Sequence, residues 1–222
     1  MKVSISLDHS YSKDLSIMVD ALRASSTITT ALQRFMRVIP IREIDEAKRL
    51  SEIHGAILAG ERDGAKIEGF DAGNSPVEIK DLEGDELVIT TSNGTRILED
   101  MHASTVLIGS FLNCRSLAMK SEELANNHIE VVMAGVRGKF AIEDFLCAGE
   151  IISHLSDNEL DEYALAAVMA SKYPDKVDDA VLNSNSAQGL RSLGLFDDVK
   201  FCLKRDIYNT VPIYKDGTIT KL

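Results

Sequence analysis

Short apolar runs recur along the chain, each ending in small polar residues and followed by an amphipathic stretch. The first run covers residues 17–19, and after a polar segment the apolar residues return with the spacing of one helix face. The same pattern recurs at 87–96, 106–113 and 131–138. The last copy predicts a helix whose buried face consists of Phe145, Ala148, Ile151, Ile152 and Leu155. Four strand–loop–helix units predict an α/β fold with a mostly parallel sheet covered by helices.

The segments between and after these units are less regular. Residues 1–7 and 199–204 alternate like strands, and 211–222 alternates around Asp216-Gly217, which predicts a hairpin. Residues 159–171 predict a helix with an inward face made of Leu160, Tyr163, Ala164, Ala167 and Val168. No linker or low-complexity stretch interrupts the chain, so residues 1–222 are expected to form one compact domain.

The polar residues that close the four apolar runs are the first candidates for a site. They are Asp20, Thr91, Ser110 and Gly135. In open α/β sheets, ligands bind at the carboxyl ends of the strands. We therefore expect these four loops to converge on one rim.

Charge restricts the partners that such a site could have. The formal net charge is −11 and the pI is about 4.9. A nucleic-acid backbone or an anionic membrane would be repelled, so neither is an expected partner. An anionic substrate would need local donors: arginines, backbone N–H groups or a metal. Cys114, Cys147 and Cys202 form no Cys-x-x-Cys pair, and residues 1–7 do not resemble a signal peptide, so we expect a reducing, cytoplasmic setting.

Asp20 and the residues after it can be interpreted in two ways. Asp20 is either a helix-capping aspartate or a ligand for a hard cation such as Mg²⁺. Arg23 with the hydroxyl cluster Ser25, Ser26 and Thr27 is either a helix start or an anion site.

Residues 60–76 combine four glycines with acids and an arginine and show little apolar periodicity. Such a segment predicts a long loop, either functional or disordered, and its carboxylates of interest are Glu61 and Asp71. The alternative is ordinary turn chemistry.

Two further segments contain candidate site residues that could also have a purely structural role. The loop 91–96 holds hydroxyls, an amide, a glycine and Arg96 before a helix, and its Asn93-Gly94 could be a plain turn. Glu143 and Asp144 open the next helix, where acids favour the helix dipole in any case. Cys147 follows, and we expect it to be a small buried residue rather than a thiolate. The five histidines lack metal-binding spacing.

No P-loop and no familiar phosphatase signature is present, but several motifs in one order resemble the 2-phosphosulfolactate phosphatase family. The motifs are Val19 to Thr27, Gly60-Glu61-Arg62 with Gly69 to Pro76, Thr90 to Thr95, Ala134 to Gly149, and a tail that includes Asp198, Cys202 and Asp206. This resemblance covers nearly the whole chain.

The resemblance implies a three-layer α/β/α fold with a mixed, mostly parallel sheet. It also implies a Mg²⁺-dependent acid phosphatase that converts (R)-2-phospho-3-sulfolactate to 3-sulfolactate and phosphate in coenzyme M biosynthesis. The implied catalytic residues are Asp20, Glu61, Asp71 and Asp144, and the implied metal ligands are Asp20, Glu143 and Asp144. The implied substrate-binding residues are Arg23, Ser25, Ser26, Thr27, Asn74, Ser75, Thr91, Asn93, Gly94 and Thr95.

Three alternatives remain open on the sequence. The substrate could be another small anionic phosphoester, the chain could be a non-catalytic anion-binding protein on the same scaffold, and it could form a homo-oligomer. Retention of the carboxylates favours the enzyme. Attack by water is the expected route, with a phospho-enzyme on Asp20 as the alternative.

Overall fold

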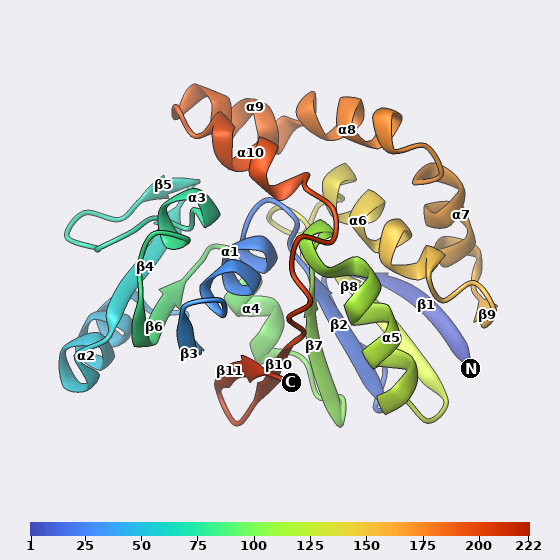
Figure 1. The fold of residues 1–222 in the computed structure, drawn as a ribbon, viewed down its shortest axis with the longest axis horizontal. Coiled ribbons are helices and arrows are strands. Elements are labelled where there is room, and N and C mark those ends of the chain that lie inside the picture. The colour runs from blue at the N-terminus through green and yellow to red at the C-terminus, as the bar shows by residue number, and fades with distance from the viewer.

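In the computed structural model, which describes residues 1–222, one sheet of eleven strands runs through the molecule (Figure 1). Its order is β5-β4-β6-β3-β11-β10-β7-β2-β8-β1-β9. The strands are β1 (Lys2–Leu7), β2 (Leu15–Val19), β3 (Phe35–Pro40), β4 (Ile57–Arg62), β5 (Ala65–Lys66), β6 (Gly84–Thr90), β7 (Thr105–Gly109), β8 (His128–Met133), β9 (Glu159–Leu160), β10 (Pro212–Lys215) and β11 (Thr218–Lys221).

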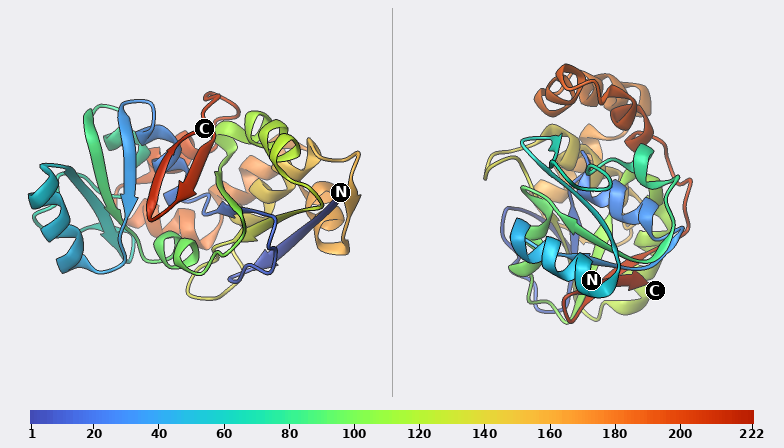
Figure 2. Two further views of the ribbon diagram at one scale, coloured as in Figure 1. Left: turned by 90° about the horizontal axis from the view of Figure 1, so that it is seen from below. Right: turned by 90° about the vertical axis from the view of Figure 1, so that its left-hand side faces the viewer.

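The sheet consists of two parallel blocks joined by the C-terminal hairpin. Strands β4, β6 and β3 pair in parallel, as do β7, β2, β8, β1 and β9. The hairpin β10–β11 lies between the blocks and pairs antiparallel with β7 on one side and β3 on the other (Figure 2, left). The expected hairpin at 211–222 is confirmed, and it makes the sheet mixed.

Helices cover both faces of this sheet. They are α1 (Ala24–Ala31), α2 (Ile44–His54), α3 (Pro76–Ile79), α4 (Gly94–Glu99), α5 (Cys114–Leu124), α6 (Ile142–Ser153), α7 (Glu162–Ala170), α8 (Pro174–Leu182), α9 (Asn185–Ser192) and α10 (Phe196–Cys202), with a 3₁₀ turn η1 (Phe111–Asn113).

Strand β2 shows how the layers arise from the alternation of its side chains. Ile17 and Val19 belong to a buried cluster with residues of α5 and α6, whereas Met18 belongs to a second cluster with residues of α1 and α4. The two helix pairs therefore pack on opposite faces. The three-layer α/β/α fold with a mixed, mostly parallel sheet is confirmed.

Three local predictions were wrong. Residues 199–204 do not form a strand, because α10 covers most of them. The short helix buries Val199 and Phe201 on either side of exposed Lys200, and this spacing resembles the alternation of a strand. Tyr163 does not point inward but is 70% exposed on α7, whose buried contacts are made by Ala164 and Ala167. Residues 60–76 are not one loop, since Gly60, Glu61 and Arg62 complete β4 and a tight turn leads into β5.

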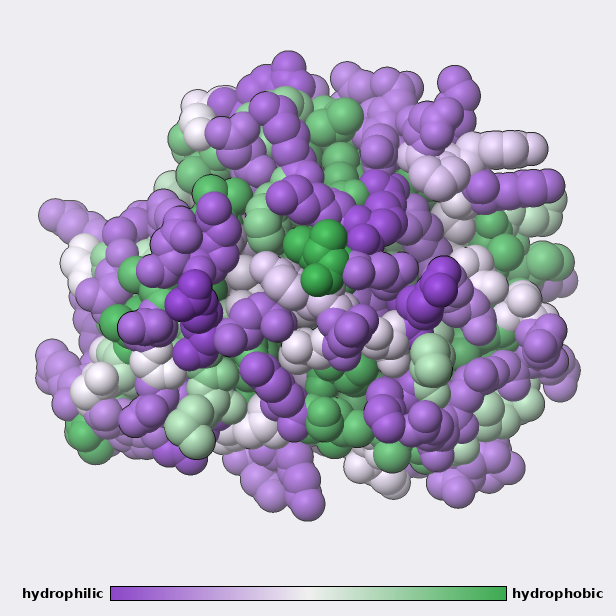
Figure 3. Space-filling view, in the orientation of Figure 1, coloured by the Kyte–Doolittle hydropathy of each residue, from purple (hydrophilic) through white to green (hydrophobic).

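The surface in view is largely polar (Figure 3). None of the helices combines the length and the apolar character that crossing a bilayer requires.

Candidate active site

A cavity of about 520 Å³ opens where strand ends from both blocks meet the C-terminal helices. Asp20 follows β2, Glu61 lies on β4, Asn93 follows β6, and Arg137 follows β8. Residues of α9 and the turn after it form the opposite wall, and α8, α9 and α10 lie along the top of Figure 1. Three of the four expected loops thus border one cavity. Ser110 does not, because its side chain forms a buried capping box with Asn113 at η1.

Asp20 is the central carboxylate of the cavity and is only 7% exposed. Its Oδ1 accepts a hydrogen bond from the Ala24 N–H at 3.3 Å. A Cβ added to Gly94 would lie 3.2 Å from Asp20 Oδ2 and 2.8 Å from Ala24 Cβ, so only glycine allows this approach. Burial raises the pKa of Asp20 to about 7, and the charges of Glu61 and Glu143 add to that rise.

Asp144, in the first turn of α6, joins the ends of two strands. Its Oδ1 accepts the Ala21 N–H at 2.8 Å and its Oδ2 accepts the Gly135 N–H at 2.9 Å. Burial, followed by repulsion from Asp20 and Glu143, raises the pKa of Asp144 well above its usual range. Both Asp144 oxygens thus hold the backbone that frames the cavity.

Glu61 holds the loop after β6 in a similar way. Its Oε1 accepts the Ser92 N–H at 2.6 Å, and its Oε2 accepts the Gly64 N–H at 2.7 Å and the Ser92 hydroxyl at 3.2 Å. These bonds position two segments of the cavity wall. Glu143 is buried near Asp20 and Asp144, and its side chain makes no hydrogen bond within the chain.

Arg23 lines the cavity and is held by two protein partners. Its Nη1 donates to Asp198 Oδ2 at 2.8 Å, and its Nη2 donates to the Gly64 carbonyl at 2.6 Å. Both charged side chains of this ion pair are 2% exposed. The residue is therefore built into the wall rather than lying free on a rim.

Asn74 and Ser75 enter the site from the segment before α3. Asn74 lines the cavity, and its buried Oδ1 has no hydrogen-bond partner. Ser75 donates to Asp198 Oδ1 at 2.6 Å and caps α3 by accepting the Glu78 N–H. An unpartnered buried carbonyl oxygen at a cavity wall is a position where a ligand can supply the missing contact.

The loop 91–95 has both lining and supporting residues. Asn93 lines the cavity, and its Oδ1 accepts the Arg137 N–H at 3.3 Å. Thr91 and Thr95 bond to each other's backbone at the start of α4. Their hydroxyls therefore shape the loop instead of pointing into the cavity.

Ten of the predicted residues do not line the cavity. Six of them lie beside it with the contacts given above: Ser75, Thr91, Gly94, Thr95, Glu143 and Asp144. The other four are Asp71, Ser25, Ser26 and Thr27. Asp71 is exposed, and its Oδ2 accepts the Leu58 N–H at 2.8 Å, so it closes a turn beside β4. Ser25, Ser26 and Thr27 are fully buried in α1: Ser25 Oγ accepts the Asp20 N–H, Ser26 Oγ donates to the Ala21 carbonyl, and the Thr27 hydroxyl has no partner. This segment packs between β2 and the core instead of presenting its hydroxyls to a ligand.

Charged residues at or beside the cavity that sequence reasoning did not assign come from three places. Arg137 and Lys139 lie in the loop after β8, and Arg137 pairs with Asp63 at the β4–β5 turn. Asp198 comes from α10 and holds Arg23 without lining the cavity itself, and the expected strand at 199–204 began one residue after it. The motif order pointed to Asp198 as a residue but carried no information about its partner.

Cys147 is fully buried on α6. Burial, and the neighbouring thiol of Cys114, raise the pKa of Cys147 well above its usual value. A thiolate nucleophile at this position is disfavoured near neutral pH.

The carboxylates suit a hard divalent cation. Asp20, Glu61, Glu143 and Asp144 form no ion pair with Lys or Arg, and burial together with the neighbouring carboxylates raises the pKa of Asp20 and of Asp144. No group of three or more His, Cys, Asp or Glu side chains converges as a closed metal site. Mg²⁺ is typically held by only one or two carboxylates together with substrate oxygens and water. Asp20 and Glu143 have oxygens left for such a role, since those of Asp144 and Glu61 hold backbone N–H groups.

The family model described as 2-phosphosulpholactate phosphatase matches residues 3–217. The chain belongs to the 2-phosphosulfolactate phosphatase family. It is 52% identical over 219 residues to the 2-phosphosulfolactate phosphatase of Methanothermobacter thermautotrophicus, which covers 99% of this chain and 95% of the relative.

More distant members of the 2-phosphosulfolactate phosphatase family also align along most of the chain. The probable 2-phosphosulfolactate phosphatase of Clostridium acetobutylicum is 40% identical over 213 residues, covering 91% of this chain and 90% of the relative. That of Thermotoga maritima is 37% identical over 210 residues, covering 90% and 89%. At the level of the family, the expectation of a phosphoric monoester hydrolase is confirmed over that of a non-catalytic anion-binding protein.

Proposed function

We propose that this chain is a Mg²⁺-dependent phosphatase that hydrolyses (R)-2-phospho-3-sulfolactate to 3-sulfolactate and phosphate. The observation that carries the proposal is the lining of one cavity. It holds the buried carboxylates of Asp20 and Glu61, which form no ion pair with Lys or Arg, and a wall with the donors of Arg23, Arg137, Lys139, Asn74 and Asn93. Family membership supports the same reaction. The product would enter coenzyme M biosynthesis, as the resemblance implies.

Asp20, which lines the cavity, and Glu143, which is buried near it, would hold the cation. When bound, Mg²⁺ neutralises charge on phosphate oxygens and acidifies a water molecule. The chain's own contribution is to fix the frame: Asp144 holds the backbone at Ala21 and Gly135. Glu61 holds the loop at Ser92, which keeps Asn93 beside the phosphate position.

The wall of the cavity would bind the anionic groups of the substrate. Arg23 presents its remaining N–H groups to the phosphate, and Arg137 and Lys139 face the carboxylate and sulfonate. Asn74 Oδ1, which has no partner in the chain, would accept a hydrogen bond from a water or from the cation's hydration shell. Asp71, Ser25, Ser26 and Thr27 have no direct part in this proposal.

Water is the proposed nucleophile. Its oxygen adds to phosphorus as it loses one proton, and the bond from phosphorus to the C2 oxygen breaks. That oxygen gains one proton and leaves as the hydroxyl of 3-sulfolactate, so water supplies both the phosphate oxygen and the hydroxyl proton. Cys147 is excluded by its burial. We further infer a reducing cytoplasmic setting, since all three cysteines are buried and unpaired.

Phosphate release from a panel of phosphorylated three-carbon acids tests the proposal. Each compound is assayed with Mg²⁺ and with EDTA. The proposal expects the highest kcat/KM for 2-phosphosulfolactate and loss of turnover with EDTA. A higher kcat/KM for a phosphoester without a sulfonate would reassign the substrate, and full activity in EDTA would remove the metal.

A further inference from the structure

Arg23 makes only two of the hydrogen bonds that a guanidinium can donate within the chain. A guanidinium carries five N–H donors in a rigid plane. One goes to Asp198 and one to the Gly64 carbonyl, and no other acceptor in the chain receives one. Because Arg23 lines the cavity, the remaining donors are available to an anion there.

Asp198 is held as firmly as the arginine that it contacts. Its Oδ1 accepts the Ser75 hydroxyl at 2.6 Å and the Val77 N–H at 3.3 Å, while its Oδ2 faces Arg23. The side chain is 2% exposed. Helix α10 packs against α3 at this point, so Asp198 joins Arg23 and the segment of Ser75 into one unit.

We propose that Asp198 is a positioning residue, which holds the Arg23 guanidinium in the plane that presents its free N–H groups to the phosphate of the substrate. This role rests on the proposed function of the cavity, in which Arg23 binds the phosphate. It assigns to α10, far along the chain from the strand ends, a direct share in building the site. Asp198 itself does not touch the substrate.

Removing the charge of Asp198 separates positioning from simple charge balance by the sign of the effect. If Arg23 kept its place without Asp198, the cavity would become more positive and anions would bind more tightly. If Asp198 fixes the guanidinium, an anion loses an aligned charge-assisted bond and binds more weakly. An asparagine at 198 would also direct an N–H group toward the Val77 N–H, which disturbs the anchor further.

The test is a double-mutant cycle with Asp198→Asn and Arg23→Lys. We would measure kcat/KM for the substrate and, by calorimetry, the dissociation constant of inorganic phosphate, both with Mg²⁺. Asp198→Asn should lower kcat/KM roughly tenfold and weaken phosphate binding by a similar factor, since one such bond is worth about that much. In the Arg23→Lys background the same change should have less than about a twofold effect, because Asp198 acts through Arg23.

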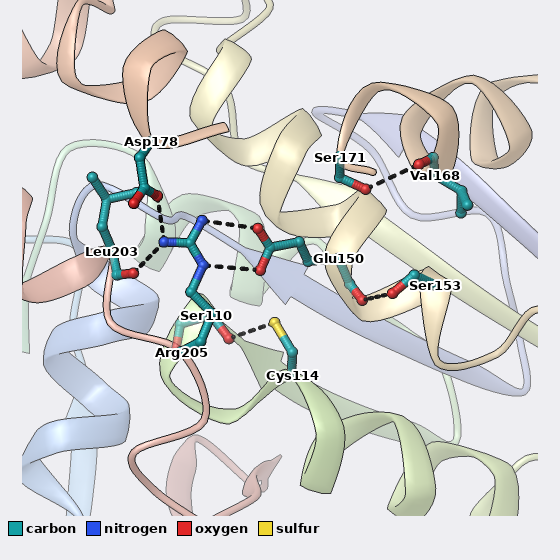
Figure 4. A network of polar contacts seen from close by, with 9 residues as sticks. All are labelled: Ser110, Cys114, Glu150, Ser153, Val168, Ser171, Asp178, Leu203 and Arg205. Carbon is teal, nitrogen blue, oxygen red and sulfur yellow. Dashed lines mark hydrogen bonds and ion pairs between the residues drawn. The ribbon is translucent and has the colours of Figure 1, made fainter. Parts of the chain in front are cut away.

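The matched control is Asp178→Asn, which removes a carboxylate from a second arginine network away from the cavity (Figure 4). It should lower thermal stability while leaving kcat/KM and phosphate binding at wild-type values. If Asp198→Asn binds phosphate as tightly as wild type or more tightly, Asp198 only balances charge. If its effect is equal in both Arg23 backgrounds, it acts independently of Arg23. Either result overturns the proposal.

Ser75→Ala is the second variant, because Asp198→Asn could fail to fold. It removes one hydrogen bond to Asp198 and the side-chain cap of α3 but leaves the ion pair, so a smaller loss of phosphate affinity is expected, again absent in the Arg23→Lys background. Equal losses in both backgrounds would contradict the role. Failure of wild type to hydrolyse 2-phosphosulfolactate would overturn the substrate, and phosphate binding would still decide the role of Asp198.

Discussion

Arg23 and Arg205 each tie the C-terminal helices to the rest of the molecule, and their guanidinium groups have different surroundings. Arg205, which follows α10, donates to both oxygens of Glu150 on α6, to Asp178 on α8 and to the Leu203 carbonyl (Figure 4). Its side chain is 25% exposed. Arg23 is almost completely buried and meets one carboxylate and one carbonyl.

The two arginines differ in how many guanidinium N–H groups have no hydrogen-bond acceptor within the chain. Four hydrogen bonds within the chain occupy the Arg205 guanidinium, so its role is complete without a ligand. Arg23 keeps unused donors at a cavity wall that also contains unpaired carboxylates. A buried ion pair alone is weak evidence for either stability or function. The unsatisfied part of its hydrogen-bonding capacity is what marks Arg23 as a ligand-binding residue.

The sharpest contrast between the two regions comes from removing one carboxylate from each. Asp20→Asn should lower kcat by at least about a hundredfold, the scale of a lost acid–base or metal-binding group. Asp178→Asn should stay within about twofold of wild type. Steady-state kinetics on both variants, with circular dichroism to verify folding, measures the difference. Equal effects would show that the cavity carboxylates are structural.

The raised pKa of Asp20 should make stability without metal depend on pH. The pKa of Asp20 is raised from 3.8 to about 7, so the folded state binds more protons than the unfolded chain between these values. This contribution is therefore favourable at low pH and is lost as the pH rises toward 7. Added Mg²⁺ should restore stability at pH 8, by about 2.7 kcal/mol at a hundredfold excess over its Kd.

Denaturant unfolding in EDTA at pH 5 and pH 8 tests this linkage. The stability of Asp20→Asn relative to wild type should increase by about 2–3 kcal/mol between the two pH values. Asp178→Asn serves as the control, with no comparable change relative to wild type. If the difference in stability between wild type and Asp20→Asn changed neither with pH nor with Mg²⁺, these carboxylates would not be a cation site.

Much of the frame of this comparison could be predicted from the sequence. Apolar runs ending in polar residues located β2, β6, β7 and β8, because parallel strands buried on both faces are almost continuously apolar. Asp20, Asn93 and the loop at Gly135 were therefore expected at one rim, and residues of all three loops line the cavity. Gly94 was selected as part of a loop, and its role in admitting Asp20 became evident only from the packing of α1 against α4.

The second half of the cavity could not be predicted in this way. Asp198 meets Arg23 across 175 residues, and no local pattern encodes such a contact. The hydroxyl cluster at 25–27 has the composition of an anion site, yet in the folded chain it packs in the core, because side-chain direction depends on the start of α1. Asp71 shows the same limitation: its turn chemistry was visible, and its distance from the cavity was not.

Replacing each arginine by alanine separates the roles of the two networks. Arg23→Ala leaves Asp198 buried and unpaired, so it should cost about 3–5 kcal/mol of stability and also lower kcat/KM by more than about tenfold. Arg205→Ala should cost less, about 1–3 kcal/mol after allowance for its solvent exposure, with kcat/KM unchanged.

Thermal melts and kinetics on the two alanine variants are sufficient to test this. Arg23→Lys adds a control that keeps the charge but loses the planar fork. A folded Arg23→Ala protein with normal kcat/KM would assign Arg23 to the same structural class as Arg205.

Cys147 gives the smallest expected effect and tests whether the two regions communicate through α6. This helix carries Asp144, which holds the backbone beside the cavity, and Glu150 in the Arg205 network, and Cys147 lies between them. Its thiol is fully buried beside Cys114, and its raised pKa keeps it protonated.

Cys147→Ala removes one sulfur from a packed core, which should cost about 1 kcal/mol of stability, a shift of about 2–4 °C in the melting temperature of a chain of this size. The substitution leaves the backbone contacts of Asp144 and the ion pair of Glu150 in place, so kcat/KM should stay within about twofold of wild type. Alkylating reagents should inactivate the native enzyme slowly. Cys114→Ala is the matched control, since it removes the partner thiol from α5 without touching α6. Loss of turnover in a folded Cys147→Ala protein, with normal turnover in Cys114→Ala, would mean that the thiol takes part in the chemistry or that α6 transmits core packing to Asp144.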